Sequence, residues 1–523
     1  MQSLLFRTSL VAVFLSGCGG DAAPPTSTSG EAVDEVDAVE LHLQVVTFCG
    51  NCHACPSPDS FPRDAWFNEV QRGFKFYDES GREDLQRPRP VDVVDYYRAR
   101  APEKLSTAVT RFKPDSSLQF RKTQWHSKSA GDSPMISALT IRVSQADTTK
   151  KIIASDMRTG EIVEITPGLE SCTARLIAKL KHPAKTVCCD LDRDGKEDLL
   201  VAELGSQLPS DNRVGEVVWI RSIDSEVPES PVVIAGRLGR VSDVVVLDAD
   251  NDGDQDIVVS VFGWQKTGEI LLLEHADSGG SPSAARFSTH VIDARHGTIQ
   301  TGVYDMNRDG TQDLLALISQ EHEQIVLFPG KSDGQFDIPR VVFDAGEPAF
   351  GSSSMGVVDI DNDGDPDSIY TNGDTLDSYY VKPYHGVHWM ENEGTLPFQH
   401  HRLATFAGAT CVVPGDFDGD GDCDLIASSF LPKILKTQIQ QSSYPTLIWL
   451  EQQKGRFDSY LLETAEVGHM VILADDLDAD GASDLIVGHY IDGSYSGTPS
   501  VSIWWNRRTK ASPGERGVQV DLP

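Results

Sequence analysis

DLDRDGKED, at residues 190–198, is the first of six acidic nonapeptides in a chain of 523 residues. The other five are DADNDGDQD at 248–256, DMNRDGTQD at 305–313, DIDNDGDPD at 359–367, DFDGDGDCD at 416–424 and DLDADGASD at 476–484. Their first residues lie 58, 57, 54, 57 and 60 positions apart. The chain therefore repeats a unit of about 57 residues, a period that is typical of propellers, solenoids and arrays.

The spacing of the carboxylates within each nonapeptide predicts a calcium site. Oxygens at positions 1, 3, 5 and 9 converge on one hard cation if the backbone turns sharply, and glycine at position 6 permits that turn. The pattern matches the first half of the EF-hand calcium loop, although no glutamate follows at position 12 and no helix is expected beside the loop. The predicted ligands of the six sites are Asp190, Asp192, Asp194 and Asp198; Asp248, Asp250, Asp252 and Asp256; Asp305, Asn307, Asp309 and Asp313; Asp359, Asp361, Asp363 and Asp367; Asp416, Asp418, Asp420 and Asp424; and Asp476, Asp478, Asp480 and Asp484.

A tight Asp/Gly turn without a metal is the alternative interpretation of any single copy. Six copies in register, however, each gather four ligand side chains where carboxylates repel one another. Asn307 lowers the ligand charge of the third loop, so we expect a weaker site there. The chain has 45 basic and 79 acidic residues, so six divalent ions would change its net charge from −34 to −34 + 12 = −22. A chain that remains this acidic is not expected to bind nucleic acid.

Short apolar runs on both sides of each loop indicate two strands joined by the acidic turn, such as VVVL before and IVVS after residues 248–256. A further strand signature follows in each unit, for example VVWI at 217–220. Residues 137–165 have the same layout without the acidic loop, and Asp147 is the only acidic residue left in its place. Counting this degenerate unit, we expect a mainly β fold, a seven-bladed β-propeller of four-stranded blades over residues 111–508, followed by a C-terminal tail at 509–523.

With these loops the chain resembles the FG-GAP or VCBS repeat proteins, whose blades carry a D-x-D-x-D-G-x-x-D loop followed by an apolar pair. The six loops match that pattern residue by residue apart from Asn307. The resemblance implies a calcium-binding β-propeller similar to that of integrin α heads and of many exported bacterial proteins. It implies no particular activity, because propellers host adhesion, lyase, dehydrogenase and scaffold functions alike.

The N-terminus resembles a bacterial lipoprotein signal over residues 1–18. Arg7 precedes the apolar run SLVAVFL, which is too short to span a bilayer, and the following LSGC resembles the lipobox whose cysteine, here Cys18, becomes lipidated. An ordinary cleavage site with a chance cysteine is the alternative. Gly19 does not signal inner-membrane retention, so we expect an exported protein that is lipid-anchored in the cell envelope, at the outer membrane, and faces the periplasm or the cell surface. Residues 19–40 are acidic and rich in small residues, which predicts a flexible tether.

Cys49-Gly-Asn-Cys52-His53 is a C-x-x-C-H pentapeptide, the attachment pattern of haem c. In that pattern two thiols bond to the haem and the histidine supplies the proximal iron ligand. Residues 41–110, with helical-looking segments, are similar to small cytochrome-c-like domains that precede FG-GAP propellers in environmental bacteria. No methionine lies between His53 and Met135 to serve as the sixth ligand. A Cys49–Cys52 disulfide, with Cys55 nearby, and a small metal site are alternatives.

The remaining cysteines suggest stabilising pairs, since Cys411 and Cys423 flank the fifth loop and Cys172 has Cys188 and Cys189 as candidate partners. No hydrolase elbow, zinc-protease helix or phosphate-binding glycine motif occurs in the sequence. Polar side chains on strands that lead into the loops are the candidates for a site near the propeller axis, and they are Lys185, Arg240, Asp243, Gln300 and His469.

The function that these features predict is binding. The propeller is expected to present a rigid, loop-rich face to a protein or polysaccharide ligand at the cell envelope, and a haem c at Cys49, Cys52 and His53 would couple that scaffold to electron transfer. The alternative is a propeller enzyme, either a haem-linked oxidoreductase or a polysaccharide-cleaving enzyme.

Overall fold

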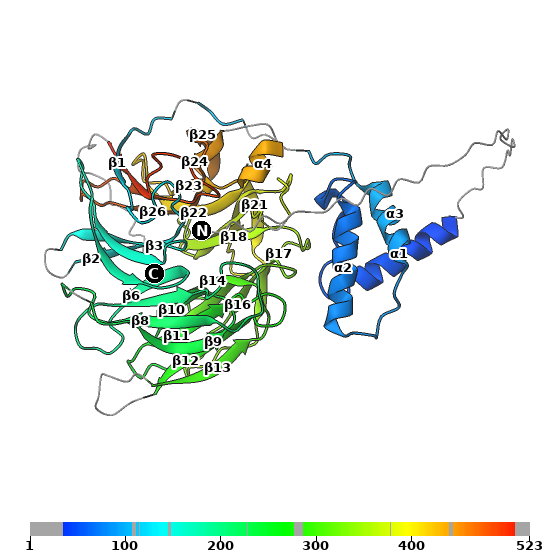
Figure 1. Ribbon diagram of the computed structural model, residues 1–523, viewed down its shortest axis with the longest axis horizontal. Coiled ribbons are helices and arrows are strands. Elements are labelled where there is room, and N and C mark those ends of the chain that lie inside the picture. Colours follow the sequence, from blue (N-terminus) through cyan, green and yellow to red (C-terminus); the bar gives the residue numbers. More distant parts are fainter. Residues whose placement is uncertain are drawn as a thin grey trace, which may run out of the picture.

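The computed structural model describes residues 35–507, except 107–110, 115, 145–147, 227, 277–285, 377 and 439–442. The predicted signal peptide, Cys18, Asp147 and the C-terminal tail lie outside the described residues. Seven four-stranded antiparallel sheets follow one another along the chain and form a seven-bladed β-propeller (Figure 1). The predicted fold class is confirmed, including the degenerate first blade.

The strands fall into blades of four in chain order. Blade 1 contains β2 (Ile136–Val143), β3 (Lys150–Asp156), β4 (Glu161–Thr166) and β5 (Thr173–Lys179), and blade 2 contains β6 (Pro183–Cys189), β7 (Asp198–Glu203), β8 (Gly215–Ile220) and β9 (Val232–Leu238). Blade 3 contains β10 (Val241–Leu247), β11 (Asp256–Val261), β12 (Glu269–Ala276) and β13 (Arg286–Asp293), and blade 4 contains β14 (Thr298–Tyr304), β15 (Asp313–Ile318), β16 (Gln324–Phe328) and β17 (Arg340–Asp344). Blade 5 contains β18 (Ser352–Val358), β19 (Asp367–Asn372), β20 (Gly386–Glu391) and β21 (Gln399–Thr405), and blade 6 contains β22 (Ala409–Gly415), β23 (Asp424–Ser429), β24 (Tyr444–Gln453) and β25 (Arg456–Ala465).

Blade 7 is closed by a strand from the other end of the propeller. It contains β26 (His469–Asp475), β27 (Asp484–His489) and β28 (Val501–Asn506), and its outer strand is β1 (Phe120–Trp125). β1 pairs antiparallel with β28, with Phe120 opposite Asn506 and Trp125 opposite Val501. The ring is therefore completed by hydrogen bonds between segments more than 370 residues apart in the chain.

The first strand of each blade contacts the first strands of both neighbouring blades, so these seven strands form the inner ring. Each inner strand has a β-bulge at its second residue. In four blades that residue carries a hydroxyl, which donates to the first carbonyl of the next inner strand. These bonds are Ser137 to Pro183 (2.6 Å), Ser242 to Thr298 (2.8 Å), Ser353 to Ala409 (2.8 Å) and Thr410 to His469 (2.6 Å). The bulges thus help to fix the spacing of the blades.

The hydrophobic core lies between the blades rather than in one central region. Seven clusters of buried apolar side chains each join two neighbouring blades. Trp449, for example, is fully buried on β24 and packs with Ile472 of blade 7. Because every blade buries both faces against a neighbour, the second strands of blades 2 to 7 are buried along their whole length.

Three helices precede the propeller, namely α1 (Glu35–Cys49), α2 (Trp66–Ser80) and α3 (Pro90–Arg100), with a short 3-10 helix η1 (Pro58–Ser60) between the first two. α1 begins within the stretch that we expected to be a tether. Pro90 occupies the first turn of α3, and Gly81 ends α2 in a left-handed conformation (φ 70°). A further short helix, α4 (Lys433–Gln438), lies in blade 6.

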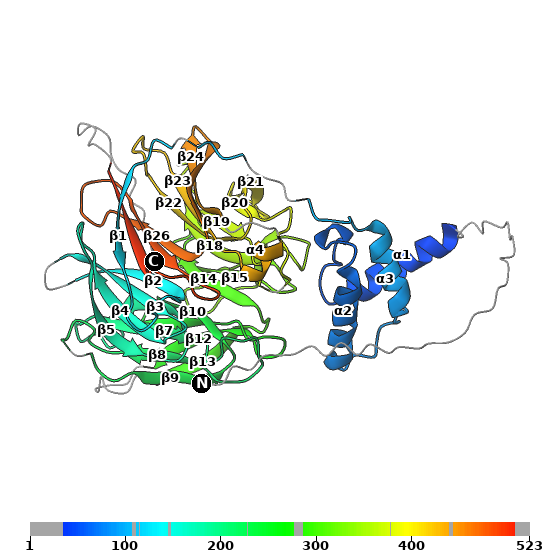
Figure 2. The same cartoon turned by 45° about the horizontal axis from the view of Figure 1, so that its top comes forward.

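Aromatic side chains hold the three N-terminal helices together. The rings of Trp66 and Tyr97 are stacked with centroids 3.8 Å apart, and Phe48 stacks on Phe74 at 5.2 Å. Figures 1 and 2 show this helical segment at one side of the propeller. None of the helices in the described part of the chain combines the length and the apolar content that crossing a bilayer requires.

The helical segment contacts the propeller at the loops of blade 5. The Ser57 N–H donates to Glu347 Oε2 (2.8 Å), and the ring of Phe61 lies edge-on to Tyr380. Lys382 Nζ lies 4.6 Å from the centre of the Phe61 ring and donates to the Ala349 carbonyl (2.6 Å). Burial lowers the pKa of Lys382 to about 8. The contact is therefore a packed, partly desolvated interface.

Candidate functional site

Each acidic nonapeptide lies between the first and second strands of its blade, as the flanking apolar runs predict. Position 9 is the first residue of the second strand in all six cases. Because the blades share one topology, the six loops lie on the same face of the propeller. We refer to them as loops 1 to 6, in the order of blades 2 to 7.

The backbone of every loop turns at two residues rather than one. The glycine at position 6 has a positive φ, as expected, with values of 80° to 94° at Gly195, Gly253, Gly310, Gly364, Gly421 and Gly481. The residue at position 4 is also left-handed, with φ of 55° to 76° at Arg193, Asn251, Arg308, Asn362, Gly419 and Ala479. A left-handed conformation costs roughly 1–2 kcal/mol for a residue with a side chain, so its recurrence at such residues in five of the six loops points to a compensating interaction.

The first aspartate of the loops gives the strongest indication of a cation-binding site. Its Oδ2 accepts the position-6 N–H, at 3.1 Å in loops 1 and 2 and 2.9 Å in loop 4. Its Oδ1 is buried in the same three loops and has no hydrogen-bond partner among the described residues; these atoms belong to Asp190, Asp248 and Asp359. A buried carboxylate oxygen without a donor is costly unless a cation satisfies it.

The ligand atoms lie at distances that suit calcium. In four loops three carboxylates each place an oxygen within 4.8 Å of the others, and the sets are Asp190, Asp192 and Asp194; Asp248, Asp250 and Asp256; Asp359, Asp361 and Asp367; and Asp416, Asp418 and Asp420. Oxygens around one Ca²⁺ lie at most about 5 Å apart, since each bond is about 2.3–2.6 Å long. The residues present therefore fit calcium, and the aspartates and Asn307 would hold it.

The aspartate at position 9 has a structural role that the spacing did not reveal. Asp198 Oδ2 accepts the N–H of Leu191 (3.3 Å) and the indole N–H of Trp219 (2.9 Å), while its Oδ1 accepts the Ser222 N–H (2.8 Å). Equivalent bonds recur at Asp256, Asp313, Asp367 and Asp484. Burial raises the pKa of Asp367 and Asp484 to about 7. Position 9 therefore clamps the loop to the end of the third strand.

Loop 1 carries cations of its own. Arg221 Nε donates to Asp192 Oδ2 (2.9 Å), and Lys196 Nζ donates to Asp194 Oδ2 (3.0 Å). These side chains compete with a metal ion for two of the predicted ligands. Loop 1 is therefore expected to bind calcium less tightly than loops 2 and 4. Loop 3 is also expected to bind calcium less tightly, but for a different reason, because Asn307 is neutral.

Blade 1 has side-chain cations in place of the acidic loop, and one of them, Arg142, is buried. The guanidinium of Arg142, which is only 4% exposed, donates to Glu197 (2.6 Å), to Glu164 (2.5 Å) and to Asp224. Lys150 donates to Asp475 Oδ1 (2.8 Å) at the edge of loop 6. The degenerate blade thus joins its neighbours through ion pairs.

Comparison with known proteins agrees with this geometry. Residues 190–259 and 305–370, which include loops 1, 2, 3 and 4, match the FG-GAP-like repeat family. The chain carries FG-GAP-like repeats. No curated protein matches it. Among solved structures, a lectin of Agrocybe aegerita described by its specific recognition of non-reducing terminal N-acetylglucosamine shares 13% identity with a TM-score of 0.40, over 70% of this chain and 84% of the lectin.

The C-x-x-C-H pentapeptide lies beside the FG-GAP-like propeller, where α1 ends. The Cys49 thiol is buried, which raises its pKa to about 12, while Cys52 is exposed and accepts a hydrogen bond from Arg82 Nη1 (3.1 Å). The Cys55 thiol contacts the Tyr97 hydroxyl (3.4 Å). All three cysteines are free thiols, so no disulfide joins Cys49 to Cys52.

His53 has the arrangement that an iron ligand requires. Its Nδ1 lies 2.7 Å from the Ala54 carbonyl, so Nδ1 carries the proton and Nε2 keeps a free lone pair. Cys49, Cys52 and His53 therefore fit covalent attachment of a haem and one axial bond to its iron. His42, on α1, is hydrogen-bonded to the Tyr96 hydroxyl (2.8 Å).

The cysteines of the FG-GAP-like blades do not form the suggested pairs. Cys411 lies opposite Ser428, whereas Cys423 directly precedes Asp424, which lies opposite Gly415. Four residues along a strand span about 13 Å, so the two thiols are too far apart for a disulfide. Cys172, Cys188 and Cys189 are also free.

The candidate axial residues separate into two groups. Lys185, Asp243 and Gln300 follow the bulge at equivalent positions of β6, β10 and β14. Asp243 accepts the Thr301 N–H (2.8 Å), and burial raises its pKa to about 6 while the charge of Lys185 opposes that shift. Arg240 instead lies against the Phe262 ring, 5.1 Å from its centre.

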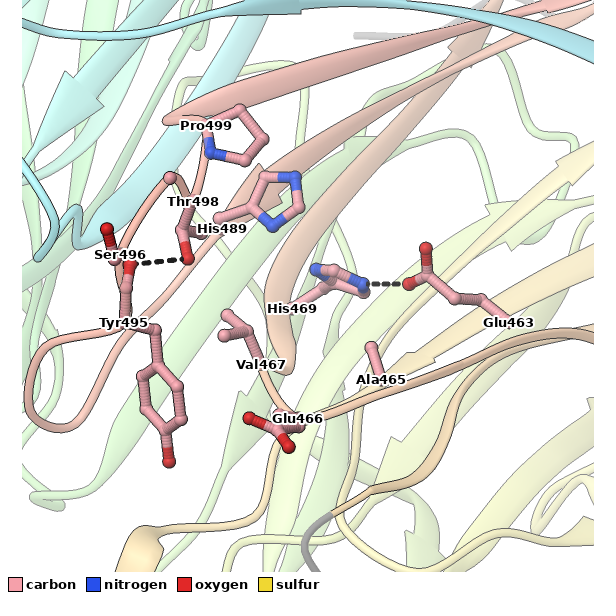
Figure 3. A pocket seen from close by; sticks show the side chains of 11 residues that line it. Glu463, Ala465, Glu466, Val467, His469, His489, Tyr495, Ser496, Thr498 and Pro499 are labelled. Carbon is pink, nitrogen blue, oxygen red and sulfur yellow. Dashed lines mark hydrogen bonds and ion pairs between the residues drawn. The ribbon is translucent and has the colours of Figure 1, made fainter.

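His469 lines a pocket in blade 7 of the FG-GAP-like propeller, with a volume of about 380 Å³ (Figure 3). Its Nε2 is hydrogen-bonded to Glu463 Oε2 (2.7 Å), and its ring lies nearly perpendicular to that of His489, with centroids 4.8 Å apart. The Nδ1 atoms of both histidines are buried without a partner among the described residues. Burial by itself raises the pKa of Glu463, but the bond from His469 and the charge of Lys122 lower it to about 2.

Proposed function

We propose that the protein is an exported, calcium-binding propeller that acts as an interaction scaffold at the cell envelope. The observation that carries this proposal is the set of six acidic loops, which share one backbone conformation and in three cases leave a buried carboxylate oxygen without a donor. Bound Ca²⁺ would satisfy these oxygens and fix the loops. A ring of blades held in this way offers rigid loops to a protein or polysaccharide partner.

The location follows from the N-terminal sequence. A lipid attached to Cys18 would anchor the chain, and the absence of an aspartate after that cysteine favours the outer membrane. The helical segment would then stand between the anchor and the propeller. Its contact with blade 5 supports a fixed orientation of one relative to the other.

The scaffold function is tested by binding of envelope polysaccharides and proteins to the immobilised full chain. Binding is expected to be saturable in Ca²⁺, to be lost on chelation and to fall in an Asp248→Asn/Asp359→Asn variant. Asp333→Asn is the matched control, because Asp333 is an exposed aspartate outside the six loops. Binding that survives both chelation and the loop substitutions would refute a calcium-dependent scaffold.

An enzymatic function is the second candidate, and the pocket at His469 favours it. His469, paired with Glu463, and His489 line this pocket and are its candidate acid–base groups. The same experiment distinguishes the two functions. Conversion of a bound polysaccharide to shorter products, abolished by His469→Gln, would identify an enzyme.

Electron transfer is the additional function that a haem would supply. Cys49 and Cys52 would hold the porphyrin and His53 would bind the iron. A haem held there would supply one-electron oxidation and reduction. In the described residues 54–106 no histidine or methionine is present as a sixth ligand, and His42 on α1 is hydrogen-bonded to the Tyr96 hydroxyl, so we expect a five-coordinate iron or one that takes a ligand from outside the segment.

A visible spectrum of the full chain, produced in a periplasm with haem-attachment machinery, tests this expectation. We expect a sharp α-band on reduction, lost in Cys49→Ala/Cys52→Ala and retained in Cys55→Ala, because Cys55 lies outside the pentapeptide. A featureless visible spectrum would contradict haem attachment and leave calcium-dependent binding as the proposed function.

A further inference from the structure

Three metal-ligating side chains meet on the face of the propeller opposite the acidic loops. His296 lies in the connection from β13 to β14, and Glu321 and His322 lie in the turn from β15 to β16. One ligand atom from each lies within 4.8 Å of the other two. His296 Nε2 and Glu321 Oε1 are 2.8 Å apart. Two segments that are distant in sequence thus bring two imidazoles and a carboxylate together.

The two segments are held in place independently of these side chains. The Ser319 N–H and hydroxyl both donate to the Gly297 carbonyl, at 2.8 and 3.0 Å. The Gly297 N–H donates to the Phe262 carbonyl (2.9 Å). Arg295 Nη1 donates to Gln324 Oε1 (3.0 Å), which ties the same segments on the other side. Because the backbone is fixed, little ordering would be needed when an ion binds.

The turn that carries Glu321 and His322 has an unusual backbone. Gln320 and Glu323, on either side of the pair, are left-handed with φ of 58° and 46°. Residues with side chains adopt this region at a cost, and such residues concentrate at functional sites. The conformation directs two consecutive side chains toward His296 instead of alternating them across a strand.

The donor set selects against calcium and for a transition metal. Ca²⁺ takes oxygen ligands, whereas imidazole suits Zn²⁺, Cu²⁺, Ni²⁺ and Fe²⁺, and two histidines with one carboxylate form a recurrent three-ligand site for such ions. The ring of His322 has no hydrogen bond to any residue that the structure describes, so its nitrogens are not engaged by another side chain. The side chains of His296 and Glu321 are 20% and 31% exposed, so an ion can enter from solvent.

We propose that His296, Glu321 and His322 bind one divalent transition-metal ion of the Zn²⁺ type, with a coordination position open to solvent. A tetrahedral ion with bonds of about 2.0–2.1 Å holds its ligand atoms roughly 3.4 Å apart, within the spacing of the three side chains. The site is separate from the six calcium loops and rests on neither the proposed scaffold function nor the haem.

The test is a titration of the full chain, kept saturated with Ca²⁺, with Co²⁺ as a coloured substitute for Zn²⁺. We expect one equivalent to give visible d–d bands without the intense near-ultraviolet absorption of a cobalt–thiolate bond, and Zn²⁺ to displace it. His296→Gln and His322→Gln should each weaken binding at least about tenfold, since even the loss of an outer-shell partner weakens metal sites by that amount.

His290→Gln is the matched control, because His290 pairs with Glu274 at 2.9 Å on exposed strands and offers a similar histidine–carboxylate pair. This variant should bind Co²⁺ as the unaltered chain does. His322→Gln removes no hydrogen bond that the structure describes, so its melting temperature reports whether loss of metal reflects misfolding. Failure to bind Co²⁺, or equal binding by all three variants, would show that His296 and Glu321 form a simple ion pair.

Discussion

Removal of calcium is expected to lower the melting temperature of this protein by about 15 °C or more. Each occupied loop contributes roughly 2.7 kcal/mol when free Ca²⁺ is a hundredfold above its dissociation constant, so six loops contribute about 16 kcal/mol. A change of 1 kcal/mol in the free energy of unfolding shifts the melting temperature of a domain of 150–250 residues by about 2–4 °C. The shift is smaller for a larger protein such as this propeller. The reason for so large an effect is that chelation leaves the carboxylates of each loop facing one another, with buried oxygens unsatisfied at Asp190, Asp248 and Asp359.

The measurement is a calorimetric melt in Ca²⁺, in excess chelator and after Ca²⁺ is restored. Asp248→Asn should remove the contribution of about one site, roughly 2–3 kcal/mol, from the calcium-dependent part of the free energy of unfolding. Asp333→Asn, outside the loops, should leave that part unchanged. A melt that does not move with chelator would show that the six turns are stable without metal and would overturn the calcium assignment.

Replacement of Arg142 by methionine is expected to reduce the free energy of unfolding by about 3–5 kcal/mol. Removing one partner of a buried ion cluster leaves the others as uncompensated charges, and Arg142 is shared by Glu164, Glu197 and Asp224. Methionine fills a similar volume, so the loss reflects charge rather than a cavity. Denaturation by urea in saturating Ca²⁺ measures the effect.

Arg63→Met serves as the comparison for Arg142→Met. Arg63 pairs with Glu103 at 3.3 Å, but its side chain is 42% exposed and that of Glu103 is 83% exposed. An exposed pair of this kind contributes at most about 1 kcal/mol. Equal losses in the two variants would mean that the Arg142 cluster is no more stabilising than a surface ion pair.

The repeat could be predicted because its signal is local. The acidic loops mark the junction of the first and second strands, and the even spacing gives the number of blades, including one without the loop. The left-handed residue at position 4 could not be predicted, because residues as different as Arg193, Asn251 and Ala479 occupy it. The clamp at position 9 was also missed, since most of its partners are backbone N–H groups, one in the loop and one near the end of the third strand, which no side-chain pattern records.

Contacts between distant segments account for what the sequence did not reveal. Residues 120–125 have no repeat motif, so nothing marks them as the outer strand of blade 7. His296 and Glu321 belong to different connections, and His469 of blade 7 meets Glu463 of blade 6; each site exists only once the blades are packed. Cys411 and Cys423 were placed together because both flank one loop, but strand register separates them.

The closure of blade 7 determines how the ring responds to mechanical force. In the ladder between β1 and β28, Phe120 lies opposite Asn506, and the Arg507 N–H donates to the Gln119 carbonyl (2.8 Å) just beyond them. Tension applied between the N-terminal segment and the C-terminal end therefore enters at the same end of that ladder. Its hydrogen bonds would break one after another, as in a zipper, instead of sharing the load. The pairing of β1 with β28 in blade 7 is thus the first contact to separate when the molecule is stretched.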